Sequence, residues 1–141
     1  MLVRSDSVEQ TEAIAAELAR TSAGGECIAL EGELGAGKTQ FVRGLVTGLN
    51  GPARAVSSPT YMLLNVYPGG RLTVYHLDAY RIGGADDFEA IGFSELLEQK
   101  GLVVVEWASR ISSLLPPRHL SVTIQAVGPT QREIQIVRSS Q

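Results

Sequence analysis

The chain has 141 residues, of which 44% are hydrophobic and 19% are charged, and its formal net charge is −3. This length and composition are typical of one folded domain, so residues 1–141 are expected to form a single unit. The slightly acidic balance provides no broad basic surface, which argues against direct binding of RNA or DNA. No apolar run approaches membrane-spanning length and residues 1–6 lack a signal-peptide pattern, which favours a cytoplasmic protein without a membrane partner.

The first half of the chain is predicted to contain two helices with a strand between them. Ser5-Asp6-Ser7 resembles a helix cap, and apolar residues then recur at helical spacing until the Gly-Gly pair at 24–25. Residues 27–31 form a short apolar run suited to a buried parallel strand, in which Cys27 is expected to be a small buried residue. Residues 39–49 again show helical spacing, and the Asn-Gly-Pro sequence that follows ends this helix.

The second half is predicted to hold most of the strands. Its extended or apolar stretches are residues 56–67, 72–77, 102–105, 119–126 and 133–137. A Pro-Gly-Gly turn at 68–70 joins the first two as a hairpin, although Pro59 interrupts the earlier stretch. Two short helices are expected, one after the Asp-Asp pair at 86–87 with a weak point at Gly92, and one over residues 109–114. This order predicts an α/β, P-loop NTPase-like layered domain with a mixed parallel/antiparallel sheet flanked by helices.

A phosphate-binding motif lies between the first predicted strand and the second predicted helix. Residues 32–39 read Gly-Glu-Leu-Gly-Ala-Gly-Lys-Thr and fit the P-loop pattern G-x-x-x-x-G-K-[ST]. Backbone N–H groups of such a loop and the dipole of the following helix bind phosphate together. The motif predicts that ATP and Mg²⁺ are bound by Gly35, Ala36, Gly37, Lys38, Thr39 and Gln40. Within this set Lys38, one of only two lysines, is the predicted catalytic cation, and the Thr39 hydroxyl is a predicted Mg²⁺ ligand.

Two of the predicted strands are followed directly by a carboxylate. Asp78 follows residues 72–77 and Glu106 follows residues 102–105, at the strand ends where α/β sheets bind ligands. A P-loop site needs acidic groups to hold Mg²⁺ and to position water, and the spacing allows either acid to take either role. His76 alternates in phase with Asp78, so it can orient that acid, contact a partner, or be a buried structural histidine.

Ser58-Pro59-Thr60 lies between the P-loop helix and the next predicted strand. In P-loop hydrolases a loop at this place often carries a threonine that senses the γ-phosphate and Mg²⁺. Thr60 is therefore a candidate switch residue with a catalytic role, and a proline-kinked edge strand is the alternative interpretation.

The ordered motifs resemble the TsaE (YjeE) family of small bacterial ATPases over about residues 7–137. The resemblance rests on residues 32–39, on Ser-Pro-Thr-Tyr at 58–61, on His-Leu-Asp-Ala-Tyr-Arg at 76–81 and on Glu-Trp at 106–107. It implies an ATP-hydrolysing accessory protein that is needed for the threonylcarbamoyladenosine (t6A) modification of tRNA. It also implies action on the TsaB–TsaD complex, which carries out the transfer, so that tRNA is met only through that complex.

The resemblance further implies roles for single residues. These are phosphate and Mg²⁺ binding by Lys38 and Thr39, metal binding by Glu106, hydrolysis by Asp78, nucleotide sensing by Thr60, and nucleotide contacts by Trp107 and Arg132. Trp107 can alternatively be a core residue at the sheet edge. The N-terminal helix is a candidate wall of the base pocket. Hydrolysis by the chain alone is expected to be slow, because Arg81 is the only nearby candidate for an arginine finger.

Two other functions fit parts of the sequence. A small-molecule P-loop kinase is the main alternative, although no Arg-rich lid segment is visible. A nucleotide-dependent binding module with negligible hydrolysis is the second, because a P-loop indicates phosphate binding without indicating turnover. A GTPase is disfavoured because the chain lacks the guanine motif [NT]-K-x-D.

Overall fold

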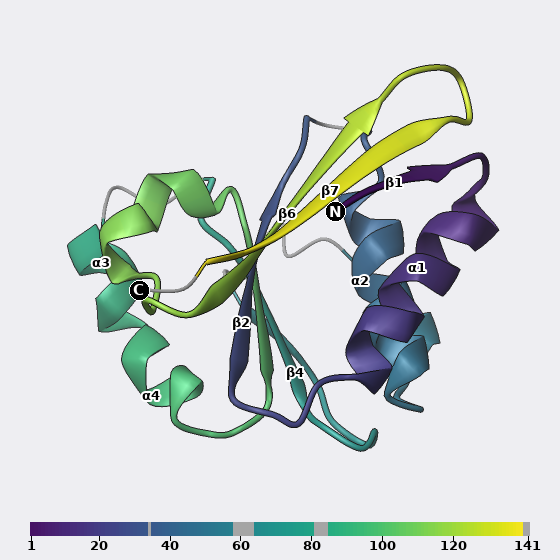
Figure 1. Cartoon of the computed structure of the whole chain (residues 1–141). Coiled ribbons are helices and arrows are strands. Elements are labelled where there is room, and N and C mark those ends of the chain that lie inside the picture. The colour runs from purple at the N-terminus through teal and green to yellow at the C-terminus, as the bar shows by residue number, and fades with distance from the viewer. Residues whose placement is uncertain (34, 58–63, 81–84, 140–141) are drawn as a thin grey trace.

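The computed structural model describes residues 1–33, 35–57, 64–80 and 85–139. These residues form a seven-stranded sheet with the order β1-β7-β6-β2-β5-β4-β3 (Figure 1). The strands are β1 (Leu2–Ser5), β2 (Glu26–Glu31), β3 (Leu64–Tyr67), β4 (Val74–Asp78), β5 (Leu102–Glu106), β6 (His119–Ala126) and β7 (Arg132–Ser139). The four central strands are parallel, whereas β3 pairs antiparallel with β4, β7 with β6, and β1 with β7. The predicted mixed sheet is confirmed.

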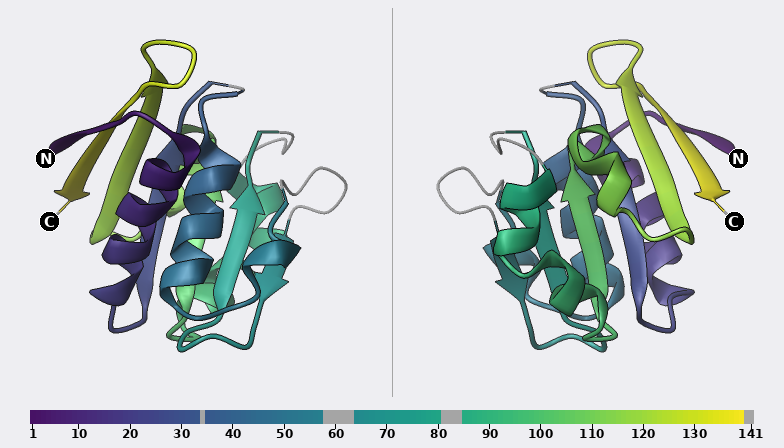
Figure 2. Two further views of the ribbon diagram at one scale, coloured as in Figure 1. Left: turned by 90° about the vertical axis from the view of Figure 1, so that its right-hand side faces the viewer. Right: turned by 90° about the vertical axis from the view of Figure 1, so that its left-hand side faces the viewer.

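Helices cover both faces of this sheet (Figure 2). One face carries α1 (Val8–Arg20) and α2 (Lys38–Gly48), and a short 3₁₀ turn, η1 (Ala53–Ala55), follows α2. The other face carries α3 (Ala85–Ala90), α4 (Phe93–Leu97) and a 3₁₀ segment, η2 (Ala108–Leu114). The layers are those expected for an α/β chain in which each face of the sheet must be buried.

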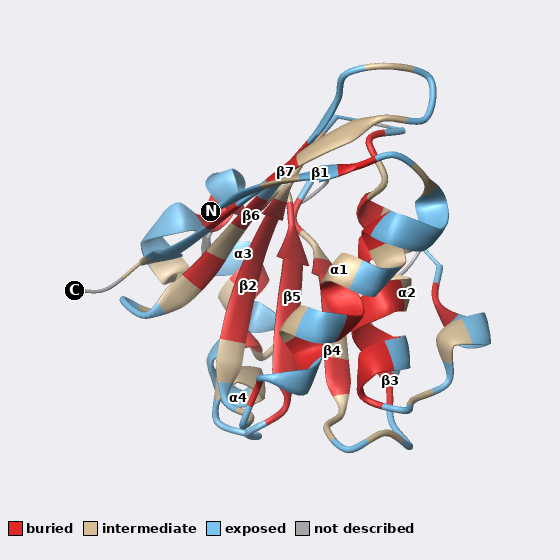
Figure 3. Ribbon diagram, turned by 45° about the vertical axis from the view of Figure 1, so that its right-hand side comes forward, coloured by how far each residue is buried: buried red, intermediate tan, exposed pale blue. Residues whose placement is uncertain are grey.

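The central strands are buried on both faces, as Figure 3 shows in red. Because side chains alternate along a strand, Ile28 and Leu30 of β2 pack with α1 and α2, whereas Cys27 and Ala29 pack with α3 and η2. Burial raises the pKa of the Cys27 thiol to about 12, since the thiolate loses its hydration. Cys27 is therefore the small buried residue that its place in the sequence predicted.

Helix α1 is fixed at its start by a cap and along its length by close contact with α2. The Ser7 side chain accepts a hydrogen bond from the Gln10 N–H at 3.1 Å, and the Gln10 side chain accepts one from the Asp6 N–H at 2.7 Å. A Cβ at Gly44 of α2 would lie 2.4 Å from the Glu12 carbonyl oxygen of α1. Glycine is required at this position because α1 crosses α2 at backbone distance.

The structure departs from the sequence prediction at several elements. Strand β1 was not predicted; it is only four residues long and pairs with β7 from the far end of the chain. The helix expected over residues 86–97 is divided into α3 and α4, because the backbone of Gly92 is left-handed with φ 91°. The segment at 109–114 begins one residue earlier and is 3₁₀ rather than α-helical.

Within the predicted stretch 56–67, strand is present at Leu64–Tyr67, and residues 58–63 lie outside the described part of the chain. The hairpin prediction is confirmed by the antiparallel pairing of β3 with β4. Among the helices that the structure describes, none combines the length and the apolar character needed to span a bilayer.

Candidate nucleotide-binding site

The loop between β2 and α2 turns around two glycines with left-handed backbones. Gly35 has φ 80° and Gly37 has φ 111°, values that residues with a Cβ rarely adopt. Gly37 is the N-cap of α2, and no described side chain caps the helix start. The N–H groups of the first turn are therefore available to an anion, as a P-loop requires.

The Lys38 side chain crosses this loop. Its ammonium donates a hydrogen bond to the Gly32 carbonyl at 2.5 Å and lies 4.1 Å from the centroid of the Trp107 ring. Lys38 is only 7% exposed, so the charge is partly desolvated. Trp107 is half-buried; it packs partly against the α3–η2 layer, and its ring lies 4.8 Å from the ring of Tyr80. The core interpretation of Trp107 thus describes one part of its surroundings, and the other part is its contact with Lys38.

The two candidate acids end neighbouring strands and lie side by side. Asp78 of β4 is paired in register with Glu106 of β5, on the same face of the sheet as α2. The Asp78 carboxylate accepts a hydrogen bond from the Tyr80 N–H at 2.8 Å. Burial is the largest influence on Asp78 and raises the pKa of its carboxyl, with the charge of Glu106 adding to the rise. The Tyr80 N–H and the charges of Lys38 and His76 act in the opposite direction.

Glu106 is almost fully buried and is hydrogen-bonded to the ring Nε2 of His76. His76 is itself completely buried on β4. The in-phase alternation of His76 and Asp78 is confirmed, but the acid bonded to His76 is Glu106 on the neighbouring strand. Sequence spacing does not reveal this contact, because it depends on which strands are adjacent and in what register.

A cavity of about 260 Å³, here called the charged cavity, opens where these groups meet. It is lined by Gly35, Gly37, Lys38, Thr39, Gln40, Asp78, Glu106 and Trp107. In the described part of the chain, no three or more His, Cys, Asp or Glu side chains are grouped to hold a metal unaided. The oxygen donors of this cavity, on Thr39, Asp78 and Glu106, fit Mg²⁺, which takes one or two protein oxygens and draws its remaining ligands from phosphate and water.

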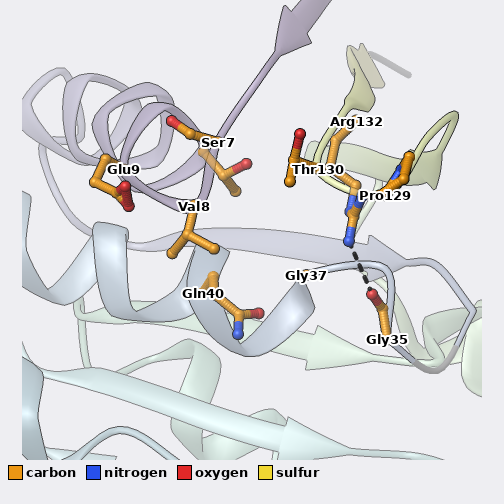
Figure 4. Close-up of a pocket in the computed structure, with 10 residues that line it drawn as sticks. Ser7, Val8, Glu9, Gly35, Gly37, Gln40, Pro129, Thr130 and Arg132 are labelled. Carbon is orange, nitrogen blue, oxygen red and sulfur yellow. Dashed lines mark hydrogen bonds between the residues drawn. The ribbon is translucent and has the colours of Figure 1, made fainter.

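A second cavity of about 300 Å³, here called the α1-side cavity, lies on the other side of the P-loop (Figure 4). Side chains from the start of α1, from α2 and from the β6–β7 turn surround it. They belong to Ser7, Val8, Glu9, Thr11, Gln40, Pro129, Thr130 and Arg132. The backbone of Gly35 and Gly37 borders this cavity as well as the charged one. The helix predicted to form a pocket wall does line this cavity.

Arg132 connects the β6–β7 turn to the P-loop. Its guanidinium donates to the carbonyls of Ala36 at 2.8 Å and Gly35 at 3.3 Å, and the latter bond is dashed in Figure 4. It also donates to the carbonyls of Gly128 at 3.1 Å and Gln131 at 2.9 Å. The side chain therefore holds backbone on two sides of the cavity. Ala36 is buried in the core and lines neither of these two cavities; it borders a third cavity of about 310 Å³ between the P-loop and β6.

The remaining predicted positions, Thr60 and Arg81, lie outside the described residues. Gln40 and Arg132, which line the α1-side cavity, were predicted site residues, whereas the individual α1 residues and Pro129 and Thr130 of the turn were not. The Ser7 cap was recognisable from the sequence, but nothing local indicates that this helix start faces the P-loop. Its position follows from the packing of α1 on α2 and from the pairing of β1 with β7.

Comparisons with known proteins identify the family. The family described as threonylcarbamoyl adenosine biosynthesis protein TsaE matches residues 5–134. The tRNA threonylcarbamoyladenosine biosynthesis protein TsaE of Bacillus subtilis is 40% identical over 131 residues, which cover 93% of this chain and 81% of the relative. The protein of the same name from Treponema pallidum is 42% identical over 112 residues, or 79% and 82% of the two chains.

The fold agrees with this match. The crystal structure of Bacillus subtilis YdiB superposes with a TM-score of 0.81 and 32% sequence identity. The superposition covers 100% of this chain and 86% of YdiB. From the matched family, the relatives and the shared fold, we conclude that this chain belongs to the TsaE family.

Proposed function

We propose that this chain binds ATP with Mg²⁺ across the P-loop and hydrolyses it to support the machinery that makes t6A in tRNA. The observation that carries the proposal is the meeting of two unlike cavities at Gly35, Gly37 and Gln40. The charged cavity contains Lys38, Asp78 and Glu106, whereas the α1-side cavity is lined mainly by uncharged residues. A nucleoside triphosphate has the same division, with charged phosphates joined to a neutral nucleoside.

In this proposal the residues of the charged cavity divide the work. Lys38 stabilises the charge that develops on the β- and γ-phosphate oxygens. Thr39 and Glu106 would hold Mg²⁺, which neutralises charge on those oxygens when it is bound. Asp78 orients the water that attacks the γ-phosphorus, so that ADP and inorganic phosphate leave. Thr60, outside the described residues, keeps its proposed role as a sensor of the γ-phosphate.

The residues on the other side of the loop hold the nucleotide in place. The start of α1 and the β6–β7 turn enclose the nucleoside, and Trp107 borders the phosphates beside Lys38. Arg132 acts mainly by joining the P-loop to the β6–β7 turn, since its donors are engaged by the carbonyls of both segments.

The names of the relatives place them in t6A biosynthesis. We propose the same pathway for this chain, in the cytoplasm, with TsaB and TsaD as the partners and tRNA reached through them. Hydrolysis by the isolated chain is slow in this proposal and rises when the partners bind.

The test is ATP turnover by the purified chain, alone and with TsaB–TsaD. Lys38→Gln removes the charge and leaves a polar side chain that is one atom shorter; we expect about a 100-fold loss of turnover or more, as when one transition-state donor is removed. Lys100→Gln, at the exposed second lysine, is the matched control and should leave turnover unchanged. Turnover that ignores the partners but rises with small-molecule phosphate acceptors would instead favour a kinase.

A further inference from the structure

Three buried side chains form a connected row behind the charged cavity. Its members are Glu106 at the end of β5, His76 in β4 and Tyr67 in β3, three neighbouring strands at one side of the sheet. His76 is 0% exposed and Glu106 is 3% exposed. A carboxylate this deeply buried is costly unless a hydrogen-bonding partner faces it. The Nε2 atom of His76 supplies that partner.

The second ring nitrogen of His76 also has a partner. Its Nδ1 lies 3.5 Å from the hydroxyl oxygen of Tyr67. The Tyr67 hydroxyl accepts a hydrogen bond from the Ser57 N–H at 3.2 Å, and its single proton is shared between the Ser57 carbonyl at 3.1 Å and Nδ1 of His76. It accepts from the Asn65 side chain at 3.3 Å as well. The His76 ring is therefore held at both nitrogens, so its orientation is fixed between β3 and β5.

This chain of contacts ends on a group that lines the charged cavity. Glu106 borders that cavity together with Lys38, Thr39 and Asp78. A carboxylate has two oxygens, so one can accept from His76 while the other is presented to a cation. Hydrogen bonds behind a ligating carboxylate fix its orientation, and the loss of such a partner typically weakens metal binding 10–100-fold.

We propose that His76, steadied by Tyr67, is a positioning residue that orients Glu106 toward a divalent cation beside the nucleotide phosphates. This inference rests on the proposed function, because it takes Glu106 as a metal-site residue. It assigns to His76 a role toward Glu106 rather than toward Asp78. It also predicts that two residues remote from the nucleotide control the requirement for Mg²⁺.

The experiment measures binding of a fluorescent N-methylanthraniloyl ADP at equilibrium, first in EDTA and then over a titration of Mg²⁺. In His76→Leu, the Mg²⁺ concentration for half-maximal enhancement of binding should rise about tenfold or more. The affinity in EDTA should stay within about twofold of the unmodified chain, because the P-loop is unchanged. If His76 only filled the core, its replacement would not change the Mg²⁺ requirement while leaving the affinity in EDTA unchanged.

Conservative and control variants sharpen this result. His76→Gln keeps an amide N–H near the position of Nε2, so it should restore most of the Mg²⁺ response. His119→Gln makes the same change at the chain's other histidine, whose Nδ1 lies 2.8 Å from the Pro116 carbonyl, and should have no effect. An unchanged Mg²⁺ requirement in folded His76→Leu, or an equal change in His119→Gln, would overturn the proposal.

Tyr67→Phe decides the matter where His76→Leu fails to fold. It removes one hydroxyl from a buried ring, and Tyr75→Phe, on the opposite face of β4, is its matched control. We expect a rise of about threefold in the Mg²⁺ requirement for Tyr67→Phe and none for Tyr75→Phe. Equal behaviour of the two would refute the role of Tyr67 and His76. Absence of nucleotide binding by the unmodified chain in both buffers would instead refute the proposed function.

Discussion

The charged cavity and the α1-side cavity, two of the cavities that border the P-loop, are built in different ways. The charged cavity draws its acids from the ends of β4 and β5, two central strands buried on both faces. The α1-side cavity draws its walls from the first helix and from the turn between the last two strands. The acids of the charged cavity are thus held by central strands, whereas the α1-side cavity forms only where residues 7–11 and 129–132 come together. The comparison suggests that chemistry and nucleotide retention can be disturbed separately.

The largest effect is expected in the charged cavity, from Asp78→Asn. Turnover should fall about 10²–10⁴-fold, because the amide cannot accept a proton or orient water as the carboxylate does. Nucleotide affinity should change little. Burial raises the pKa of Asp78 above its ordinary value of 3.8, so this carboxylate takes up a proton at a higher pH than an exposed aspartate would. On acidification, the unmodified chain should therefore lose activity at a correspondingly higher pH.

Steady-state kinetics and nucleotide titration measure these two quantities separately. Asp86→Asn, an exposed position at the start of α3, is the control. Parallel losses of affinity and turnover in Asp78→Asn would show that the two cavities do not act independently.

A smaller effect is expected where Arg132 joins the β6–β7 turn to the P-loop. Arg132→Lys keeps the charge, but a single ammonium cannot reach the four carbonyls that the guanidinium fork bonds. Nucleotide affinity should fall about tenfold in EDTA, with the Mg²⁺ requirement unchanged. Arg138→Lys, on the same strand and paired with Glu26 at the surface, is the matched control. Full affinity in Arg132→Lys would contradict the role assigned to this clamp.

The contact between α1 and α2 offers a test that reaches the α1-side cavity from a distance. Gly44→Ala places a Cβ 2.4 Å from the Glu12 carbonyl oxygen and 2.7 Å from the Glu12 Cα, so α1 must move outward. Overpacking of this kind costs about 1–3 kcal/mol of unfolding free energy, which urea unfolding measures. Nucleotide affinity should fall severalfold because Ser7, Val8 and Glu9 move with the helix.

Thr47→Ala, at an exposed position of α2, is the control for this change. If Gly44→Ala also raised the Mg²⁺ requirement, α1 would contribute to the charged cavity as well.

The smallest effect on the two cavities is expected at Cys27, which lines neither of them and lies on the face of β2 that packs with α3 and η2. Its thiol is buried and its pKa is raised to about 12, so a thiol reagent such as DTNB should react about 100-fold more slowly with the folded chain than in urea. The rate should stay slow in Asp78→Asn and Arg132→Lys, which would show that their effects are local. Rapid labelling of the unmodified chain would contradict the buried position.

Part of the site could be predicted because its signals are local. The P-loop needs glycines, a lysine and a threonine at fixed spacing, and a strand that ends in a carboxylate places the acid at the ligand-binding edge. Gly92 was recognisable as a break in a helix for the same reason, since its backbone conformation suits glycine. These predictions involve neighbouring residues whose geometry a short stretch of sequence dictates.

Other features depend on contacts between distant residues. Strand β1 is too short to be recognised from its sequence pattern, and it forms because it pairs with the edge of β7. The bond between His76 and Glu106 requires β4 and β5 to be adjacent and in register. The α1-side cavity requires residues 7–11 and 129–132 to meet across the P-loop.

The sequence by itself determined that this chain has a mixed α/β fold, a loop with the P-loop sequence and two acids at strand ends, because these follow from periodicity and from local backbone chemistry. Only the tertiary structure decided which acid His76 holds, what Arg132 bonds, and which residues enclose the second cavity. Side-chain partners across 30 or 96 positions of sequence are chosen by strand order and helix packing, and no local pattern encodes those choices.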